Sequence, residues 1–274
     1  MLARLTAFTT SPEGGNPAGV WIGEAFPDAA DMQRIAKEIG FSETAFVTPS
    51  SGTERTVRYY SPEAEVPFCG HATIAAGALL GEVDGEGTYR FATRSGVVAV
   101  AVHSRNGLVE ASLTSVRPRF EVASGELVGE TLAALGWELN ELDDSITPAR
   151  AYAGAWHLVL ATKTLERLSD LRYEFDALRR LMLREELTTL QLVWREEPFL
   201  FHARNPFPVG GVVEDPATGA AAAALGGYLR DAGLIEAPAS VTIRQGEAMG
   251  RPSLISVTIP REGGIVVSGT AVRI

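Results

Sequence analysis

E-D-P-A-T-G-A-A-A-A-A-L, residues 214–225, joins two carboxylates, a proline and a small polar turn to five consecutive alanines. Alanine has the highest helix propensity, and proline is common at the first helical position. We therefore predict a helix that begins between Pro216 and Gly219. Because the first N–H groups of a helix have no partner within it, such an end can bind an anionic group of a substrate.

A second stretch of small residues matches this one at a distance of 145 residues. With that shift, residues 72–81 align with residues 217–226, both beginning with Ala-Thr and ending with Leu-Gly. Each stretch follows a strand-like run, residues 56–60 and 199–203, after which comes a polar residue and a proline. The repeat favours two similar lobes with a ligand held between them. A single mixed α/β domain with two unrelated capped helices is the alternative.

The composition of the chain is that of an ordinary globular protein, with 274 residues of which 46% are hydrophobic and 21% charged. This length allows one large domain or two lobes. The 24 basic and 34 acidic residues give a net charge of −10 without a basic block, which disfavours nucleic-acid binding. The longest uncharged apolar segment, residues 217–229, is too short to span a bilayer.

The first ten residues contain no apolar stretch long enough for a signal peptide. Cys69 is the only cysteine, so no disulfide can form within the chain, as is usual in a reducing compartment. We expect a cytoplasmic protein without a membrane partner.

Apolar spacing and turn residues predict a few helices among many short strands. The expected helices cover residues 28–39, 71–80, 127–135, 176–186 and the alanine run to about 231. The expected strands cover residues 2–9, 18–22, 44–48, 54–60, 88–92, 96–103, 108–113, 158–161, 190–194, 199–203, 241–245, 254–259 and 265–268. Arg105-Asn106-Gly107 is typical of a hairpin turn.

These elements predict an α+β fold of two similar lobes, each a mostly antiparallel sheet wrapped around a central apolar helix. The chain would cross into the second half within residues 115–122. We predict one lobe over residues 1–116, joined by a C-terminal strand over 263–274, and a second lobe over 117–262.

Four blocks of the sequence resemble, in order, the signature of the phenazine-biosynthesis isomerase (PhzF-like) family. They are N-P-A-G-V at 16–20, F-S-E-T-A-F-V at 41–47, P-F-C-G-H-A-T at 67–73 and E-D-P-A-T-G at 214–219. That family is related in fold to diaminopimelate epimerase, which has two similar lobes with a central helix in each. The resemblance therefore implies the same duplication, and it implies a homodimer.

Glu43 is the candidate acid/base, because it lies between Ser42 and the apolar strand 45–47, where a sheet would place it at the edge of a cleft. One carboxyl group in a partly apolar site can both take up and return a proton. From the residues alone, a solvated carboxylate at a strand end is the alternative; the resemblance implies the family's proton-shuttling glutamate. The 145-residue shift places Thr188 opposite Glu43, so the second lobe offers no matching carboxylate.

His71 and Asp215 lie at the starts of the two small-residue helices. A histidine there can hydrogen-bond a substrate carbonyl or carboxylate, or it can simply cap the turn. Asp215 can be a plain helix-start acid. The resemblance implies that both contact the substrate, with Asp215 orienting an amine or hydroxyl group. The backbone N–H groups predicted to bind a substrate carboxylate belong to Gly70, Ala72, Thr73, Thr218 and Gly219.

Cys69 has two interpretations. The related epimerases use one cysteine per lobe as a pair of bases, and the single thiol of this chain excludes that mechanism. A lone nucleophile partnered by His71 is conceivable, but a small buried apolar cysteine is the commoner case. The remaining histidines, His103, His157 and His202, are widely spaced, and no glycine-rich phosphate motif occurs. We predict neither a metal site nor a cofactor.

The sequence thus predicts a cofactor-independent isomerase that moves a proton within a small carboxylated substrate, with Glu43 as the acid/base. An amino-acid racemase or epimerase is the alternative enzyme. A non-catalytic protein that binds a small metabolite is the alternative from another class.

Overall fold

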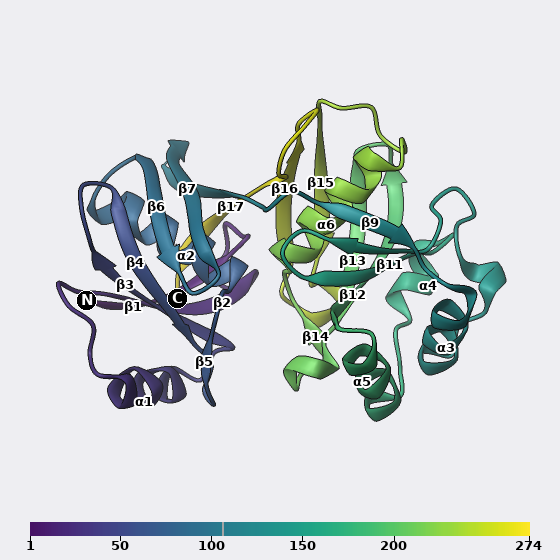
Figure 1. Cartoon of the computed structure of the whole chain (residues 1–274), viewed down its shortest axis with the longest axis horizontal. Helices are drawn as coiled ribbons and strands as arrows, with labels where there is room; N and C mark the ends of the chain where they lie inside the picture. Colours follow the sequence, from purple (N-terminus) through teal and green to yellow (C-terminus); the bar gives the residue numbers. More distant parts are fainter. Residues whose placement is uncertain (106) are drawn as a thin grey trace. The chain divides into compact units, whose positions relative to one another are not determined.

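The computed structural model describes residues 1–105 and 107–274 (Figure 1). The chain divides into two compact units, residues 1–114 with 268–274 and residues 115–267. The first unit contains β1 (Leu2–Ala7), β2 (Asn16–Ile22), α1 (Ala29–Ile39), β3 (Glu43–Pro49), β4 (Glu54–Tyr60), β5 (Glu65–Val66), α2 (Gly70–Val83), β6 (Gly87–Thr93), β7 (Gly96–Arg105), β8 (Leu108–Thr114) and most of β17 (Val266–Arg273).

The strand pairings of the first unit close into a ring. Antiparallel β1 and β2 lead to β3, which is parallel to β2 and antiparallel to β4, and β4 is parallel to β6. Antiparallel pairs then join β6, β7 and β8, and β17 pairs with both β8 and β1. Helix α2 packs against β1, β2, β3, β7 and β8, with residues 71–80 all buried. An apolar helix without a polar face is stable only when it is covered on all sides.

The second unit repeats this order of parallel and antiparallel pairs. It contains β9 (Arg119–Val122), α3 (Gly125–Leu135), β10 (Ala149–Tyr152), β11 (Trp156–Ala161), α4 (Leu165–Ser169), α5 (Phe175–Arg184), β12 (Leu187–Glu197), β13 (Leu200–Pro206), β14 (Glu214–Asp215), α6 (Gly219–Asp231), β15 (Ala239–Gln245) and β16 (Ser253–Ile259), with short 3-10 turns at Leu139–Glu141, Pro208–Gly210 and Glu247–Met249. The parallel pairs are β11 with β12 and β13 with β15, and the others are antiparallel. Helix α6 packs against β9 to β12 and β16. The predicted α+β fold of two similar lobes is confirmed.

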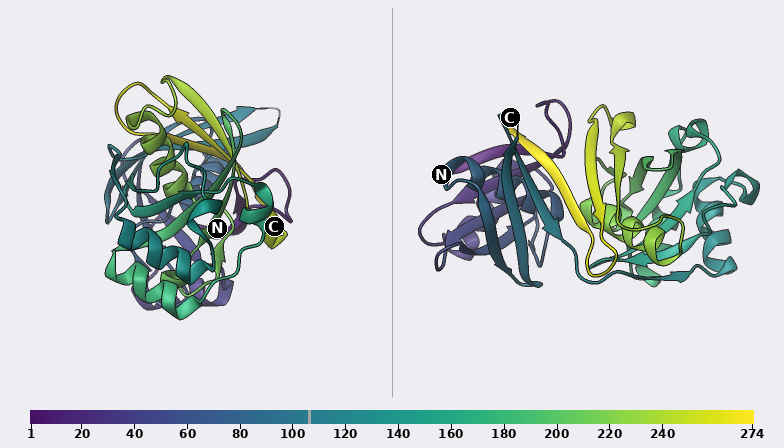
Figure 2. Two further views of the ribbon diagram at one scale, coloured as in Figure 1. Left: turned by 90° about the vertical axis from the view of Figure 1, so that its right-hand side faces the viewer. Right: turned by 90° about the horizontal axis from the view of Figure 1, so that it is seen from above.

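The first unit receives its last strand, β17, from the C-terminal end of the chain, which Figure 2 shows in yellow beside the purple N-terminal strands. After β8 the chain enters the second unit, where β9 pairs with β10. After β16 it returns to the first unit, where β17 pairs with β1. The two connecting segments are hydrogen-bonded, with Ser115 N donating to Ile265 O over 2.8 Å and Ile265 N donating to Ser115 Oγ over 2.9 Å.

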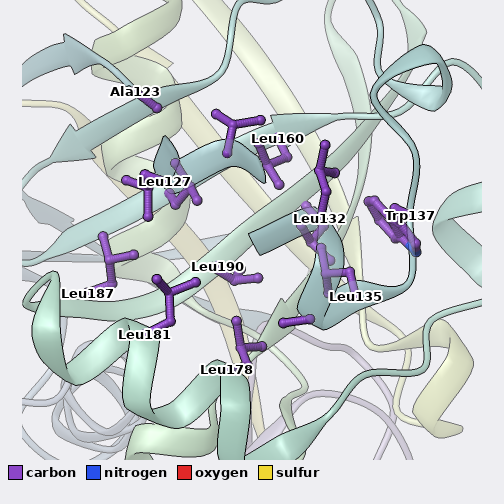
Figure 3. Packing of buried hydrophobic residues seen from close by; sticks show 14 of the residues in the cluster. Ala123, Leu127, Leu132, Leu135, Trp137, Leu160, Leu178, Leu181, Leu187 and Leu190 are labelled. Carbon is purple, nitrogen blue, oxygen red and sulfur yellow. The ribbon is translucent and has the colours of Figure 1, made fainter. Parts of the chain in front are cut away.

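A leucine-rich core lies between α3, α5 and the sheet of the second unit (Figure 3). Helix α3 begins at the Ser124 cap and ends at Gly136, which has the left-handed conformation typical of a helix C-terminus. The buried members of this core include Leu127, Leu132, Leu135, Leu158, Leu160, Leu178, Leu181, Leu187, Leu190 and Leu192.

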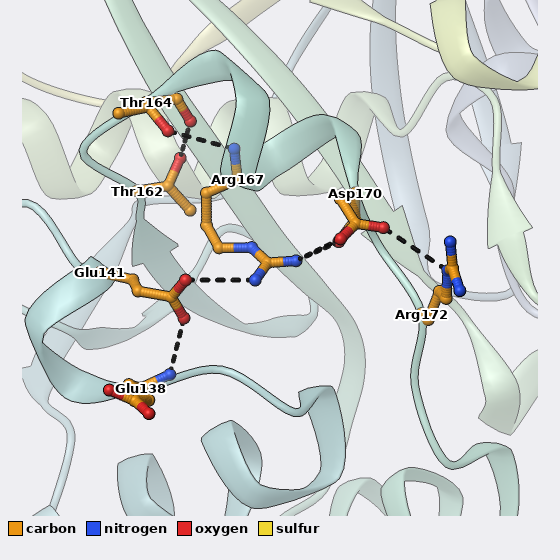
Figure 4. Close-up of polar contacts among 7 residues, drawn as sticks. All are labelled: Glu138, Glu141, Thr162, Thr164, Arg167, Asp170 and Arg172. Atoms are coloured by element: carbon orange, nitrogen blue, oxygen red, sulfur yellow. Dashed lines mark hydrogen bonds and ion pairs between the residues drawn. The ribbon is translucent and has the colours of Figure 1, made fainter.

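Polar contacts fix the short helix α4 at the edge of this core (Figure 4). The Thr164 hydroxyl caps the helix by accepting from Arg167 N over 3.1 Å. The Arg167 guanidinium donates to Glu141 Oε1 over 3.1 Å and to Asp170 Oδ2 over 3.2 Å. Arg172 lies 3.5 Å from the other oxygen of Asp170.

Three details differ from the sequence-based expectations. Helices α2 and α6 begin at Gly70 and Gly219, so the 145-residue shift misaligns their starts by about one helical turn. Runs of small residues match at several shifts, which explains the error. Helix α4 and the short strands β5, β9, β10 and β14 had not been expected. Of the expected turn, Asn106 lies outside the described residues, and Arg105 pairs with Leu108 between antiparallel β7 and β8.

None of the helices in residues 1–105 and 107–274 is long and apolar enough to cross a membrane.

Candidate active site

Glu43 is the first residue of β3, and the strand behind it is firmly held. Residues 44–48 are buried, and Glu43 itself pairs with Ala18 of the parallel strand β2. The side chain of Glu43 is 19% exposed. The carboxylate therefore stands at a rigid strand end that solvent and a ligand can still reach.

The start of α2 is fixed by a chain of buried hydroxyl groups. Thr73 Oγ1 donates to Cys69 O over 2.7 Å, so the hydroxyl of Tyr59, 2.6 Å away, is the donor to Thr73 Oγ1. Burial raises the pKa of Tyr59 well above its ordinary value, which keeps this phenol protonated. Thr73 N also donates to Cys69 O over 3.0 Å, so the prediction that this N–H group binds a substrate carboxylate is wrong. Thr73 instead holds the backbone of Cys69 through both its N–H group and its hydroxyl.

Glu43, Cys69 and His71 form one cluster. Cys69 Sγ lies 3.5 Å from Glu43 Oε2 and 3.4 Å from His71 Nδ1. His71 Nε2 lies 3.5 Å from Glu43 Oε2 and 3.3 Å from Ser42 Oγ. His71 and Cys69 are nearly buried residues, at 7% and 8% exposure. A carboxylate, an imidazole and a thiol in mutual contact can exchange protons with one another and with a bound molecule.

Backbone N–H groups complete the chemistry of this cluster. Gly70 and His71 are the first two residues of α2, and Ala72 is the third. Their N–H groups have no carbonyl partner earlier in the helix, and the positive end of the helix dipole lies there. The cluster therefore offers an acid/base beside a site suited to a carboxylate.

The second unit contains the other predicted residues, arranged around Asp215. Thr218 Oγ1 donates to Asp215 Oδ2 over 2.6 Å, and Thr218 precedes Gly219, the first residue of α6. The neighbouring carboxylate Glu214 forms an ion pair with Arg204, in which both side chains are largely buried. Residues 214–225 thus contain two carboxylates in different surroundings. Glu214 is neutralised by the Arg204 cation, whereas Asp215 contacts the Thr218 hydroxyl group at the start of α6.

Gln245, the last residue of β15, holds the segment from Asp215 to Thr218. Its side-chain amide donates to Asp215 O over 2.8 Å and to Thr218 Oγ1 over 3.0 Å, and its oxygen accepts from Thr218 N over 3.2 Å. The next residue, Gly246, has φ +76°, and a Cβ there would lie 2.6 Å from Pro216 O. Sequence reasoning missed Gln245, because a lone glutamine at the end of a strand carries no recognisable pattern.

The structure thus brings Glu43, His71 and Cys69 together with Gly70, Ala72 and Thr73 in the first unit, and Asp215 with Thr218 and Gly219 in the second. It also adds Ser42, Tyr59 and Gln245 to the residues that build these two places. Ser42 was named in the sequence only as a neighbour of Glu43. Its contact with His71 depends on the approach of α2 to β3, which a linear sequence does not reveal.

Comparison with known proteins gives matches over nearly the whole chain. The family model described as phenazine biosynthesis-like protein (PhzC-PhzF) matches residues 5–274. The chain is 28% identical over 284 residues to the uncharacterised isomerase YfhB of Bacillus subtilis, covering 97% of this chain and 94% of that protein. It is 32% identical over 256 residues to a trans-2,3-dihydro-3-hydroxyanthranilate isomerase of Pseudomonas fluorescens, covering 92% and 87%.

Solved structures agree with the fold. A predicted epimerase from Pseudomonas aeruginosa superposes with a TM-score of 0.88 and 25% identity, covering 100% of this chain and 96% of that one. A probable proline racemase from Agrobacterium radiobacter has a TM-score of 0.68 at 12% identity, covering 100% and 90%, which is a likeness of fold alone.

Proposed function

The chain belongs to the phenazine biosynthesis-like (PhzF) family of isomerases, and we propose that it moves a proton within a small carboxylated substrate with Glu43 as the acid/base. The observation that carries this proposal is the contact of one partly exposed carboxylate with both His71 and Cys69. No cofactor is needed for such a step.

Glu43 would take a proton from an activated carbon of the substrate and return it to a different carbon. His71, 3.5 Å from the carboxylate, would hydrogen-bond the substrate and stabilise the negative charge that develops. The N–H groups of Gly70 and Ala72 would bind the substrate carboxylate. A single well-placed acid/base contributes about 10² to 10⁴ in rate.

In the second unit, we assign Asp215 the role of orienting an amine or hydroxyl group of the substrate. Two observations support this role. Thr218 Oγ1 donates to Asp215 Oδ2 beside the start of α6, and the Gln245 side chain donates to Asp215 O. Gly219 would offer a further N–H group to an anionic substituent, whereas the N–H group of Thr218, also predicted to bind it, already donates to Gln245 Oε1. We also propose that the protein is located in the cytoplasm and forms a homodimer.

The test is conversion of a panel of substrates followed by proton NMR. The panel holds trans-2,3-dihydro-3-hydroxyanthranilate, further cyclic carboxylates, and proline-like amino acids. The proposal expects a double-bond shift in at least one cyclic carboxylate with the wild-type protein. Glu43→Gln should lower that rate by about 10² to 10⁴, whereas Glu63→Gln, an exposed glutamate of the same unit, should not change it.

The alternatives predict other results from the same panel. Inversion of an amino acid without a double-bond shift would favour a racemase or epimerase. Tight binding of a panel member that neither the wild-type protein nor Glu43→Gln converts would favour a metabolite-binding protein.

A further inference from the structure

We propose that Glu43, Cys69 and His71 form a binding site for a soft divalent transition-metal cation, with Zn²⁺ the best match and the fourth position open to a ligand. The three side chains offer one oxygen, one sulfur and one nitrogen donor, all within 4.8 Å of one another. They are far apart or irregularly spaced in the sequence, which is why ligand spacing did not reveal them.

Two of the three distances between the donors match the edges of a tetrahedral zinc site. Zinc–ligand bonds of about 2.3 Å to sulfur and about 2.0–2.2 Å to nitrogen and oxygen give donor–donor edges of about 3.3–3.7 Å. Here Sγ of Cys69 lies 3.5 Å from Glu43 Oε2, and His71 Nε2 lies 3.5 Å from that same oxygen. The third edge, Sγ to Nε2, is 3.9 Å. Because Sγ lies closer to His71 Nδ1, 3.4 Å away, than to Nε2, the imidazole would also have to turn about its Cβ–Cγ bond for one nitrogen to face the ion.

The chemistry of the donors selects the class of ion. Thiolate and imidazole are ligands of Zn²⁺ and its soft neighbours, whereas Mg²⁺ and Ca²⁺ take oxygen ligands. On binding, the Cys69 thiol would lose its proton to solvent, so that thiolate and carboxylate together balance the charge of the cation. Both anions would also be favoured by the positive end of the α2 dipole.

Three protein ligands with one open position are the pattern of zinc sites that bind a further molecule, not of closed structural sites. Ser42 Oγ, 3.3 Å from His71 Nε2, lies beside the cluster and could hydrogen-bond a water in that fourth position. One consequence rests on the proposed function: a metal on Glu43 would occupy the acid/base, so metal binding and proton transfer would exclude each other.

Cobalt(II) titration of the full chain, prepared reduced and metal-free, tests the site without any assay of activity. Cys69 is the only cysteine, so a sulfur-to-cobalt charge-transfer band can come from no other thiol. We expect that band to saturate at one cobalt per chain, with visible bands of four-coordinate cobalt, and to disappear when Zn²⁺ is added. Calorimetry of Zn²⁺ binding in buffers of different ionisation enthalpy should record the release of a proton.

Variants identify the other ligands. Cys69→Ser and His71→Asn should each weaken Zn²⁺ binding by at least about 10- to 100-fold, the loss seen when even outer partners of a metal site are removed. His202→Asn is the matched control, because His202 also contacts carboxylates, Glu196 and Glu247, but has no thiol beside it. Its Zn²⁺ affinity should equal that of the wild type.

Two results would overturn the site. One is wild-type protein that develops no sulfur-to-cobalt band at millimolar cobalt. The other is a Cys69→Ser protein that binds Zn²⁺ as tightly as the wild type while His202→Asn has lost that affinity. Circular dichroism would show that the Cys69→Ser protein is folded. Both are independent of isomerase activity, so they separate this proposal from the proposed function.

Discussion

At the scale of single residues, His157 shows how deeply the second unit buries its polar groups. It is fully buried on β11, with Nδ1 2.8 Å from Thr189 Oγ1, and Asn205 Nδ2 donates to the same hydroxyl over 3.1 Å. The Thr189 hydroxyl thus accepts from Asn205 and contacts the imidazole of His157. Loss of solvation on burial lowers the pKa of His157 to about 3.

This histidine predicts a dependence of stability on pH. Its pKa is lower in the folded chain than the ordinary value of about 6.5, so the unfolded chain binds more protons between those two values. The stability due to neutral His157 is therefore complete above about pH 6.5 and is lost as the pH falls toward 3. We expect a loss of about 3 kcal/mol between pH 7 and pH 4, at about 1.4 kcal/mol per pH unit. Urea unfolding at a series of pH values measures it.

The control compares two histidine variants. His157→Gln should be less stable at pH 7 but should show a shallower fall between pH 6.5 and 4 than the wild type. His103→Gln, whose parent side chain is 70% exposed, should leave the slope unchanged. Equal slopes in all three proteins would show that His157 does not carry the acid sensitivity.

Much of the first unit's site could be predicted from single residues, because Cys69 and His71 are neighbours in one block and Glu43 begins a recognisable strand. The other part depends on contacts between elements. Ser42 contacts His71 because the start of α2 approaches β3, and Gln245 hydrogen-bonds Thr218 because the start of α6 approaches β15. Neither pair has a periodic spacing, so no sequence pattern could have connected them.

At the scale of elements, the central helices are packed so closely that some positions accept no side chain. A Cβ on Gly77 of α2 would lie 2.8 Å from Val100 Cγ1 and 2.9 Å from Ala111 Cβ. Alanine favours a helix over glycine by about 1 kcal/mol, but overpacking of a core costs about 1–3 kcal/mol. We therefore expect Gly77→Ala to lower the free energy of unfolding, measured by urea denaturation.

Gly129 of α3 provides the opposite case, because a Cβ there would meet no atom within 4 Å. Gly129→Ala should raise the free energy of unfolding by about 0.5–1 kcal/mol through helix propensity alone. If Gly77→Ala stabilised the chain as much as Gly129→Ala, the close packing of α2 against its sheet would be wrong.

The side chain of Gln245 links the end of β15 to the start of α6. We therefore expect its removal to lower both the stability of the chain and its activity. Gln245→Ala leaves Thr218 N and Asp215 O without their side-chain partner, which costs about 1–3 kcal/mol of stability. The activity should also fall, because Asp215 would no longer be held. Gln33→Ala, which removes one partly exposed hydrogen bond to Ser61 O, should cost about 1 kcal/mol or less. A Gln245→Ala protein with wild-type stability and rate would contradict this role.

The sequence predicted the central helices better than their starts. Residues 72–80 and 220–229 are almost all small or apolar, on every side of the helix, which indicates burial without any help from tertiary contacts. The helix starts depend instead on how Thr73 and Gln245 hold the preceding turns. Short strands such as β9 and β10 depend on pairing with each other, and their four-residue patterns are too short to read.

At the scale of the whole molecule, the C-terminal strand is required by the first unit. β17 pairs with β1 and β8, so its removal would open the ring around α2 and leave both strands as unpaired edges. We expect a chain without residues 268–274 to lose cooperative thermal unfolding and to aggregate. Removal of Ile274 alone, which is 44% exposed, should lower the melting temperature only slightly. If the chain without residues 268–274 still unfolded cooperatively near the wild-type melting temperature, β17 would not be required by the first unit.

The central claim is that Glu43 carries the proton, and the location of solvent deuterium tests it most directly. The Glu43 side chain is 19% exposed, so the proton that it carries can exchange with solvent before it is returned. In D₂O, with a substrate from the panel that the wild-type protein converts, the account therefore predicts deuterium at the newly protonated carbon of the product. Glu43→Gln should incorporate it about 10² to 10⁴ times more slowly, while Glu63→Gln matches the wild type. Deuterium incorporation by folded Glu43→Gln at the wild-type rate would contradict the account.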